Sequence, residues 1–410
     1  MHTRALTLIA ASVVTIVFVG IGYLHPFAAG AGQPREPAAS GYQLAAVDFV
    51  TPSTGWVAAT LGSGTFALLR TNDAGSTWTR QLTGAIDQRN VYLRFFDSRR
   101  GVLGLIGPRP AVFRTADGGR TWSPRPMSSS AYLLSISFVD PDDGWLLLDT
   151  GELLRTADGG ASWSNLGVPL AAGDQAYRVQ FTDRQVGWLD SVSANPVAFK
   201  SIDGGVTWRP VPLPAPSGGW PTRREFFVAA QPTRGAGVVA TVVNFATYTG
   251  RLRRGEQVVA YPPLTVRSFD GGLPVRYSYS IFADAMPGAD LRVRSTQVQA
   301  SHEVQLGSLD GGATWKVVSP PNGAGAVGYS DALTWWWIGS GAWSTSSDGG
   351  STWTAIRNIG VIEPLPGSLQ VLDSRTAWYG AMAGGTRAML ERTADAGLHW
   401  EMVGLPAENP

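Results

Sequence analysis

The chain has 410 residues and no cysteine, and its 32 Lys and Arg residues nearly balance 31 Asp and Glu residues, which leaves a formal net charge of +1. Apolar residues make up 44% of the chain and charged residues 15%, which excludes an intrinsically disordered protein. The absence of cysteine excludes a disulfide scaffold, a cysteine-ligated zinc site, an iron–sulfur cluster and a thiol nucleophile, and the balanced charge argues against nucleic-acid binding through phosphates. The high counts of Gly (50) and Trp (16) require an explanation.

Residues 1–25 are predicted to form a signal peptide or a membrane-anchoring helix. Ala5–Leu24 carries no charge and follows Arg4, which is the order of residues in bacterial export signals. Ala29–Ala31 would serve as a cleavage site, whereas an uncleaved apolar run of about 20 residues is long enough to span a bilayer. Since Arg4 would stay in the cytoplasm, we expect an extracytoplasmic protein, either secreted or anchored to the membrane.

A linker and one large domain follow. Residues 26–41 are rich in Pro, Gly and Ala and are predicted to be flexible. Repeats fill residues 42–404, and residues 405–410 form a tail. A continuous series of repeats indicates a single domain, although the length alone would permit two or three.

The main repeat is the motif Ser/Thr-x-Asp-x-Gly-x-x-Trp, known as the Asp-box or BNR repeat. Its Asp residues are Asp73, Asp117, Asp158, Asp203, Asp270, Asp310, Asp348 and Asp395, and the copy around Asp270 is degenerate because Val275 replaces Trp. Such an Asp can accept hydrogen bonds from its own turn, the Gly permits a positive φ, and the Trp begins the returning strand. We therefore interpret these Asp residues as structural and not catalytic.

A second pattern, as in Phe138–Trp145 and Phe181–Trp188, precedes the boxes and is typical of strand, turn and strand. Each repeat then holds four strands, and most boxes recur at about the 40–50 residues of a propeller blade. The predicted fold is all-β: a single β-propeller of four-stranded antiparallel blades. Counting boxes gives eight blades, and seven would result if the enlarged blade at about 209–280 folds irregularly. The surplus Trp and Gly residues are then explained by blade contacts and turns.

The sequences at Leu153–Trp163 and Phe138–Trp145 resemble those of the Ycf48-like photosystem II assembly factors, and the resemblance covers nearly all of residues 42–404. That family is exported and non-catalytic, so the resemblance implies a propeller that binds protein partners and assists the assembly of a complex. More distantly, the boxes resemble those of the sialidase superfamily, which implies a glycoside hydrolase or a glycan-binding propeller as alternatives.

A catalytic set is hard to find in the sequence. The sialidase string Phe/Tyr-Arg-Ile-Pro does not occur, and Phe113–Ala116 is only the strand that enters a box. Glu256 with Tyr248 or Tyr261 is the one imaginable nucleophile pair, and the four His residues lack the spacing of metal ligands. We expect no catalytic residues, no cofactor and no metal, so an enzyme is the less favoured interpretation.

Basic charge is concentrated in residues 209–267, which contain eight Arg and two Glu, a net charge of +6, against −5 for the remainder of the chain. The candidate binding residues on one face of the propeller are Arg94, Arg178, Arg223, Arg224, Tyr248, Arg251, Arg253 and Arg254. They favour a protein partner with an acidic segment, with lipid headgroups or an acidic glycan as other anionic partners. The competing interpretation is a solvated, Arg-rich loop.

Three consecutive Trp residues, Trp335–Trp337, form a further unusual feature. Successive strand residues alternate between the two faces of a sheet. We therefore expect at least one of these Trp side chains between blades and another toward a channel or the surface.

Overall fold

The computed structural model describes residues 42–406 with internal gaps, of which the longest are 215–225 and 251–274. Between residues 226 and 308 the description concerns the backbone. The predicted signal or anchor at 1–25 and the linker at 26–41 lie outside the described residues. Within the part that is described, there is no helix with the length and apolarity needed to cross a membrane.

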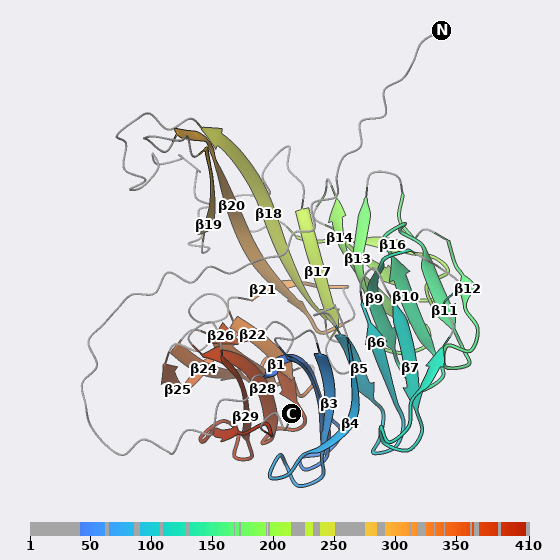
Figure 1. The fold of residues 1–410 in the computed structure, drawn as a ribbon. Coiled ribbons are helices and arrows are strands. Elements are labelled where there is room, and N and C mark those ends of the chain that lie inside the picture. The colour runs from blue at the N-terminus through green and yellow to red at the C-terminus, as the bar shows by residue number, and fades with distance from the viewer. Residues whose placement is uncertain are drawn as a thin grey trace, which may run out of the picture. The chain divides into compact units, whose positions relative to one another are not determined.

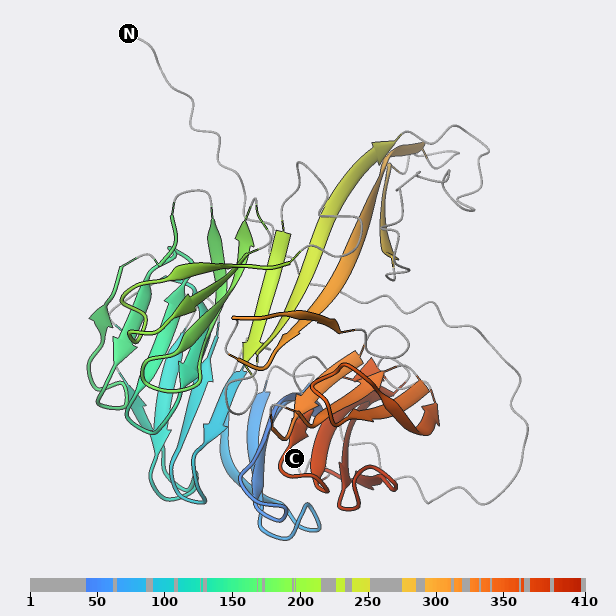
Figure 2. The same cartoon turned by 180° about the vertical axis from the view of Figure 1, so that it is seen from behind.

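The described strands form six antiparallel sheets, which we call A to F in chain order (Figures 1 and 2). Four sheets have four strands each, hydrogen-bonded in sequence order. Sheet A contains β1 (Tyr42–Phe49), β2 (Gly55–Leu61), β3 (Thr65–Thr71) and β4 (Thr79–Ala85). Sheet B contains β5 (Val91–Phe95), β6 (Gly101–Leu105), β7 (Ala111–Thr115) and β8 (Ser123–Arg125). Sheet C contains β9 (Leu133–Phe138), β10 (Gly144–Leu148), β11 (Leu153–Thr156) and β12 (Ser164–Asn165). Sheet E contains β22 (Gly325–Tyr329), β23 (Trp335–Gly339), β24 (Gly341–Ser346) and β25 (Thr354–Gly360).

The other two sheets are larger. Sheet D contains β13 (Gln175–Phe181), β14 (Gly187–Ser193), β15 (Val197–Ser201), β16 (Arg209–Pro212), β17 (Phe226–Pro232), β18 (Val238–Gly250), β19 (Val275–Asp284), β20 (Arg292–Ser308) and β21 (Lys316–Val318). Sheet F contains β26 (Glu363–Pro364), β27 (Gln370–Val371), β28 (Ala377–Ala383), β29 (Arg387–Thr393) and β30 (Glu401–Val403). The predicted all-β propeller of four-stranded antiparallel blades is therefore confirmed.

The predicted number of blades is not reproduced, because the described residues form six sheets and not eight. The difference is confined to residues 226–318. There β17 pairs with Ser191–Ser193 at the C-terminal end of β14, beyond the residues that pair with β15, so these strands join sheet D and do not form separate sheets. Strands β17, β18, β20 and β21 still follow the strand order of a blade, but β18 and β20 run on past it as a long ribbon to which β19 is added (Figure 1).

Each Asp-box closes the turn between the last two strands of its repeat by the same hydrogen bonds. In sheet B, the Asp117 carboxylate accepts from the N–H and the hydroxyl of Thr121 at 2.9 and 2.6 Å, and from the Thr115 hydroxyl at 2.9 Å. The Thr115 oxygen accepts the N–H of Gly119 at 2.9 Å. Equivalent bonds surround Asp73, Asp158, Asp203, Asp348 and Asp395. Asp310 accepts the same bonds from Thr314, and Asp270 lies outside the described residues.

The box is also the contact point for the preceding sheet. The carbonyl of Gly118 accepts hydrogen bonds from Nε1 of Trp56 at 3.1 Å and from Nη1 of Arg70 at 3.2 Å, both of which belong to sheet A. Trp145 of sheet C binds the carbonyl of Gly204 in sheet D in the same way, at 2.8 Å. A turn that is local in sequence therefore stabilises the packing between sheets.

Large aromatic side chains fill the spaces between the sheets. Trp56 stacks on Phe95 with ring centroids 3.4 Å apart, and Trp145 stacks on Phe181 at 3.6 Å. Trp378 in the last sheet stacks on Phe49 in the first at 3.7 Å, within a cluster that β1, β2, β3, β28 and β29 share. The rings of Trp56, Trp145 and Trp378 are fully buried, and their burial stabilises the contacts between sheets.

The prediction that one residue of Trp335–Trp337 faces a channel or the surface is wrong, since all three side chains are buried. Both faces of β23 are covered. Trp336 packs on Trp343 in the cluster between sheets E and F, whereas Trp335 lies against Tyr329 and Trp353 on the other face. An alternating strand has no exposed side when neighbours pack on each of its faces.

Candidate binding site

Hydrogen bonds join the first strands of neighbouring sheets near the Phe residues at or close to their ends. The N–H of Phe49 donates to Oε1 of Gln370 at 2.7 Å, the N–H of Phe138 to the hydroxyl of Tyr92 at 3.0 Å, and the N–H of Phe181 to the hydroxyl of Ser137 at 2.9 Å. The N–H of Phe95 donates to the carboxylate of Asp48. In each case the acceptor belongs to the preceding sheet: sheet F for A, A for B, B for C and C for D. A side chain of one sheet thus satisfies a backbone donor of the next.

Arg94 departs from this pattern. The residue just before the final Phe of β1 is Asp48 and that of β9 is Ser137, and each accepts the N–H of the next sheet. In β5 that position is Arg94, which cannot accept a hydrogen bond, and Tyr92 accepts instead. Arg94 therefore does not accept a backbone N–H of the next sheet, as the residues at its position in sheets A and C do.

A buried carboxylate lies behind Arg94. Nη1 of Arg94 is 3.7 Å from Oδ1 of Asp48, and the Arg94 side chain is 51% exposed whereas that of Asp48 is 5% exposed. Nε2 of Gln370 donates to the same carboxylate at 3.0 Å. Burial raises the pKa of Asp48, and the Arg94 charge and the hydrogen bonds from Phe95 and Gln370 partly oppose that rise.

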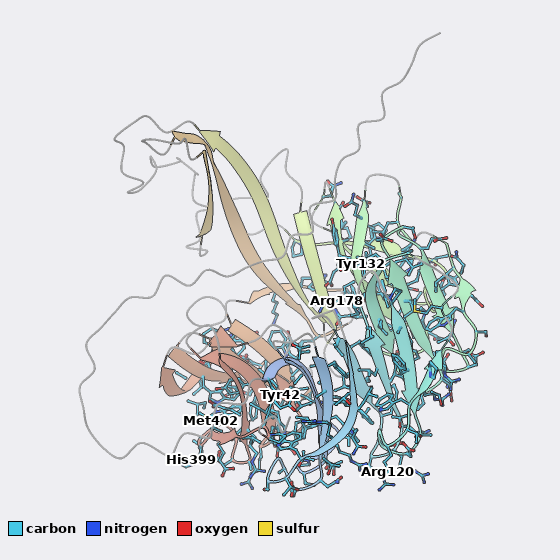
Figure 3. The ribbon with its side chains drawn as sticks, viewed as in Figure 1. Tyr42, Arg120, Tyr132, Arg178, His399 and Met402 are labelled. Carbon is cyan, nitrogen blue, oxygen red and sulfur yellow. The ribbon has the colours of Figure 1, made fainter. Side chains whose placement is uncertain are left out.

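Arg178 of sheet D is also paired with a buried carboxylate, but within its own sheet and through a hydrogen bond. Its Nε donates to Oδ2 of Asp190 at 2.6 Å, across the register pair that the two residues form between β13 and β14. The Arg178 side chain is 47% exposed and that of Asp190 is 5% exposed. In the part of the chain that the structure describes, the two terminal amino groups of Arg178 make no hydrogen bond. Figure 3 labels Arg178 near the centre of the view, between the labels of Tyr132 and Tyr42.

The structure describes no side chain of the other predicted binding residues. Arg223, Arg224, Arg251, Arg253 and Arg254 lie outside the described residues. Tyr248 lies in β18, where its backbone pairs with Val298 of β20. Sequence reasoning missed Asp48 and Asp190, although each is an isolated acid within an apolar strand, which is a usable signal for a buried charge.

A buried Tyr–Glu pair lies elsewhere, in sheet F. The hydroxyl of Tyr379 donates to Oε2 of Glu391 at 2.8 Å, and the two residues are register partners on β28 and β29. Trp400 contacts the Tyr379 ring edge-on, and burial raises the pKa of both Tyr379 and Glu391. Both side chains lie in the core of the fold, where no sugar substrate could reach them. The Tyr379–Glu391 pair was not expected from the sequence. Of the pair that was considered there, Glu256 with Tyr248 or Tyr261, both Glu256 and Tyr261 lie outside the described residues.

His399 forms an exposed pair with an Asp-box carboxylate. Its Nδ1 lies 2.6 Å from Oδ2 of Asp395 and takes the place of the Ser or Thr hydroxyl of the other boxes. In the described residues no hydroxyl is hydrogen-bonded to its other ring nitrogen, as a nucleophile would be. The described residues also contain no group of three or more His, Asp or Glu placed to hold a metal ion.

Residues 80–172 match the family model described as photosynthesis system II assembly factor YCF48, so the resemblance expected from the repeats is confirmed over a segment that includes sheets B and C. Among solved structures, YCF48 bound to a D1 peptide aligns at 16% identity over 89% of this chain and 96% of that one, with a TM-score of 0.48. YCF48 from Cyanidioschyzon merolae aligns at 15% identity over 88% and 98% of the two chains, with a TM-score of 0.49. The GH74 xyloglucanase of Xanthomonas campestris aligns at 14% identity over 89% and 74%, with a TM-score of 0.28. No curated protein sequence matches the chain.

Proposed function

We propose that the chain is a non-catalytic β-propeller that binds protein partners during the assembly of a complex, and that residues 1–25 export it and hold it at a membrane. The observation that carries the proposal is the match of residues 80–172 to a family described as an assembly factor. A propeller whose box turns are each closed by several hydrogen bonds suits this role, because such turns are rigid.

The kind of partner to test is a peptide segment of another protein. The YCF48 structure named above has a D1 peptide bound, which concerns that protein. For this chain the half-exposed Arg94 and Arg178, each paired with a buried Asp, are the described candidates for contact with such a segment. A glycoside hydrolase has less support, because the Tyr–Glu pair of sheet F is buried.

The full chain, expressed in its own host with a C-terminal tag and solubilised in mild detergent, tests the proposal. We expect one or a few membrane or envelope proteins to co-purify in a fixed ratio, and a fluorogenic sialoside and glycoside panel to remain unhydrolysed. Turnover of any glycoside, or the absence of a reproducible partner, would overturn the scaffold proposal.

The membrane tether is tested separately by fractionation. The full chain should stay with the membranes after a high-salt wash, whereas a matched variant that lacks residues 1–25 should not reach the extracytoplasmic compartment. Release of the mature chain into the soluble extracytoplasmic fraction, with a new N-terminus near Ala31, would show that the segment is a cleaved signal and that the tether is wrong.

A further inference from the structure

A three-stranded arm continues sheet D beyond the end of β17. The pairing of β17 with β18 ends at Phe226 and Asn244, whereas β18 runs on to Gly250 and stays paired with β20 throughout. β19 pairs with the same stretch of β20, and β20 is its one partner strand in the described part of the chain. We call residues 245–250, 275–284 and 292–302 the arm (Figure 1).

The register places apolar residues on one face of the arm. Directly opposed residues of antiparallel strands share a face, and successive residues alternate between the two faces. One face, which we call the tyrosine face, therefore holds the rows Ala246/Ala300/Tyr277, Tyr248/Val298/Tyr279 and Gly250/Thr296/Ile281. The rows of the other face are Phe245/Ser301/Arg276, Thr247/Gln299/Ser278 and Thr249/Gln297/Ser280. The second face thus consists mostly of Ser, Thr and Gln.

This alternation is unlike the pattern of the blades. In sheet C, Leu146, Leu147 and Leu148 are successive and all buried, because neighbouring sheets cover both faces of β10. Alternating apolar and polar residues are instead typical of a sheet with an apolar environment on one side and water on the other. The tyrosine face therefore requires a cover that the polar face does not.

The arm leaves sheet D at the end opposite the Asp-boxes. Ser308, which precedes the box of Asp310, pairs with Val238 at the far end of β18 from the arm. In sheet A, Tyr42 pairs with Leu61, which is also the end opposite the box. Contacts at the box ends join sheet A to B, B to C and C to D, so these boxes lie on one side of the propeller. The arm and the point where the chain enters the propeller are therefore both on the other side.

That side is the one that the N-terminal segment would keep near a membrane. If residues 1–25 are held in the bilayer, the linker at 26–41 can place Tyr42 at most about 55 Å from it. Residues 245–250 carry the arm about 20 Å beyond β17 on this side. Tyr suits the boundary between lipid and water, because its ring is apolar and its hydroxyl group is polar.

We propose that the tyrosine face of the arm lies on the lipid surface of the membrane, where it forms a second contact with the bilayer besides residues 1–25. The inference rests on the membrane location in the proposed function. It assigns to the enlarged part of sheet D the task of fixing the propeller at the membrane.

The first test separates the arm from the tether. The full chain, with a protease site inserted in the linker at 26–41, is reconstituted into vesicles of phosphatidylcholine and phosphatidylglycerol, cut, and floated on a density gradient. The wild-type propeller should stay with the vesicles after the cut. Tyr248→Ser/Tyr277→Ser/Tyr279→Ser should lower the ratio of bound to free chain by about tenfold or more. The matched control on the polar face, Thr247→Ala/Ser278→Ala/Ser280→Ala, should float as the wild type does.

The second test places a fluorescent probe on each face in turn and leaves most of the Tyr residues intact. Because the chain has no cysteine, Tyr279→Cys and Ser280→Cys can each be labelled with NBD at a single position. In the same vesicles, a doxyl-labelled lipid should quench the probe at 279 at least about twice as strongly as the probe at 280. Equal quenching would overturn the proposal. So would a blue-shifted probe at 279 that the lipid does not quench, because protein, from this chain or a second copy, would then cover the face.

The outcomes of the flotation test distinguish the inference from the proposed function. If the uncut chain floats and the wild-type propeller is released by the cut, the inference fails while the tether stands. If the triple Tyr variant stays bound as well as the wild type does, the tyrosine face is not the contact and the inference fails. If the uncut chain does not float, both the tether and the inference fail.

Discussion

The interface between sheets A and B and the interface between sheets F and A use the same contacts, although only the first joins sheets that are adjacent in sequence. In both, a Trp of one sheet stacks on the Phe of the next, and a side chain caps that Phe N–H. The A–B interface also has the bond from Trp56 to the Gly118 carbonyl, whereas Nε1 of Trp378 has no partner in the described residues.

At the interface between sheets F and A, contacts made by the last residues of the chain partly replace the missing Trp hydrogen bond. Nε1 of Trp78 in the first box donates to the carbonyl of Gly404 at 3.0 Å, and the side chains of Val403 and Leu405 join the cluster between the two sheets. Among the described residues, no strand is shared between the first and last sheets. Contacts of repeated side chains can therefore join sheets that lie some 300 residues apart in the sequence.

The largest effect is expected from removing the stacked Trp. Trp56→Ala and Trp378→Ala should each lower the free energy of unfolding by about 3–5 kcal/mol, because both rings are fully buried. The loss should be larger at Trp56 by about 1 kcal/mol, since that variant also breaks a hydrogen bond. Urea unfolding followed by fluorescence measures both losses of stability. Comparison of Trp56→Phe with Trp378→Phe isolates the contribution of the hydrogen bond from Trp56 to the Gly118 carbonyl. A greater cost at Trp378 would contradict the comparison.

A methyl group at Gly118 should be nearly as damaging. Its φ is 78°, and a Cβ there would lie 2.3 Å from Nη1 of Arg70 and 2.7 Å from the carbonyl oxygen of Ser98. We expect Gly118→Ala to destabilise the fold by about 2–3 kcal/mol. Gly84→Ala is the control, because no atom lies within 4 Å of its Cβ position. Thermal unfolding of both variants should separate them, and equal midpoints would refute this account of the box.

Removing residues 403–410 should weaken the contact between the last and first sheets alone. The deletion takes away the Val403 and Leu405 side chains and the bond from Trp78, and we expect a loss of about 1–3 kcal/mol. Hydrogen exchange should become faster in β1 and β28 while β6 and β10 keep their protection. The control is a chain that lacks only residues 407–410, and faster exchange in all sheets alike would count against a local role.

Acid should weaken both interfaces, because each contains one Asp-box: that of Asp117 between sheets A and B, and that of Asp73 between sheets F and A. Hydrogen bonds from the residue four positions later lower the pKa of Asp73 below its ordinary value of 3.8, and lower the pKa of Asp117 to about 2. Such groups stabilise the fold above pH 4, and that stabilisation is lost as the pH falls toward 2. The urea midpoint should fall in this range, and less steeply in Asp117→Asn. An identical slope in the variant would exclude Asp117 as a contributor.

The smallest expected effect is an increase in the free energy of unfolding. Ala74 and Ala396 take the box position that is Gly118 in sheet B, and their φ values are 58° and 64°. Replacing either with Gly should raise the free energy of unfolding by up to about 1 kcal/mol, because Gly adopts a positive φ without strain. Ala116→Gly, at a turn position without a positive φ, should lower stability slightly. Calorimetry of the three variants would show whether the strain at the first and last boxes is real.

Much of the fold follows from the sequence, because the boxes mark turns and turns mark strands. The antiparallel four-stranded units, the turn role of Gly118 and the large buried rings are all readable from the motif. The number of sheets does not follow from the boxes, because a box marks a turn and does not show which further strands pair with those around it. β14 lies between β13 and β15, and its residues Ser191–Ser193 also pair with β17, which no local pattern of the sequence indicates.

The candidate site was predictable only in part. Arg94 and Arg178 follow from their place at the first strands, but their backing groups depend on which side chain of a neighbouring strand comes within reach. Asp48 of sheet A lies beside Arg94 of sheet B, and Tyr92 of sheet B accepts the N–H of Phe138 in sheet C. These contacts can be recognised only once the sheets are packed together. The same reason hides the role of the Gly118 carbonyl as an acceptor from Trp56.

The packing of the first sheet against the last also bears on biosynthesis. Because the ribosome delivers the N-terminus first, the face of β1–β3 that carries Phe49 and Leu69 is made some 300 residues before Trp378 and Val403 cover it. Until the final strands emerge, that face is an uncovered apolar surface at risk of aggregation. Nascent chains stalled before residue 377 should therefore need a chaperone that the finished chain does not.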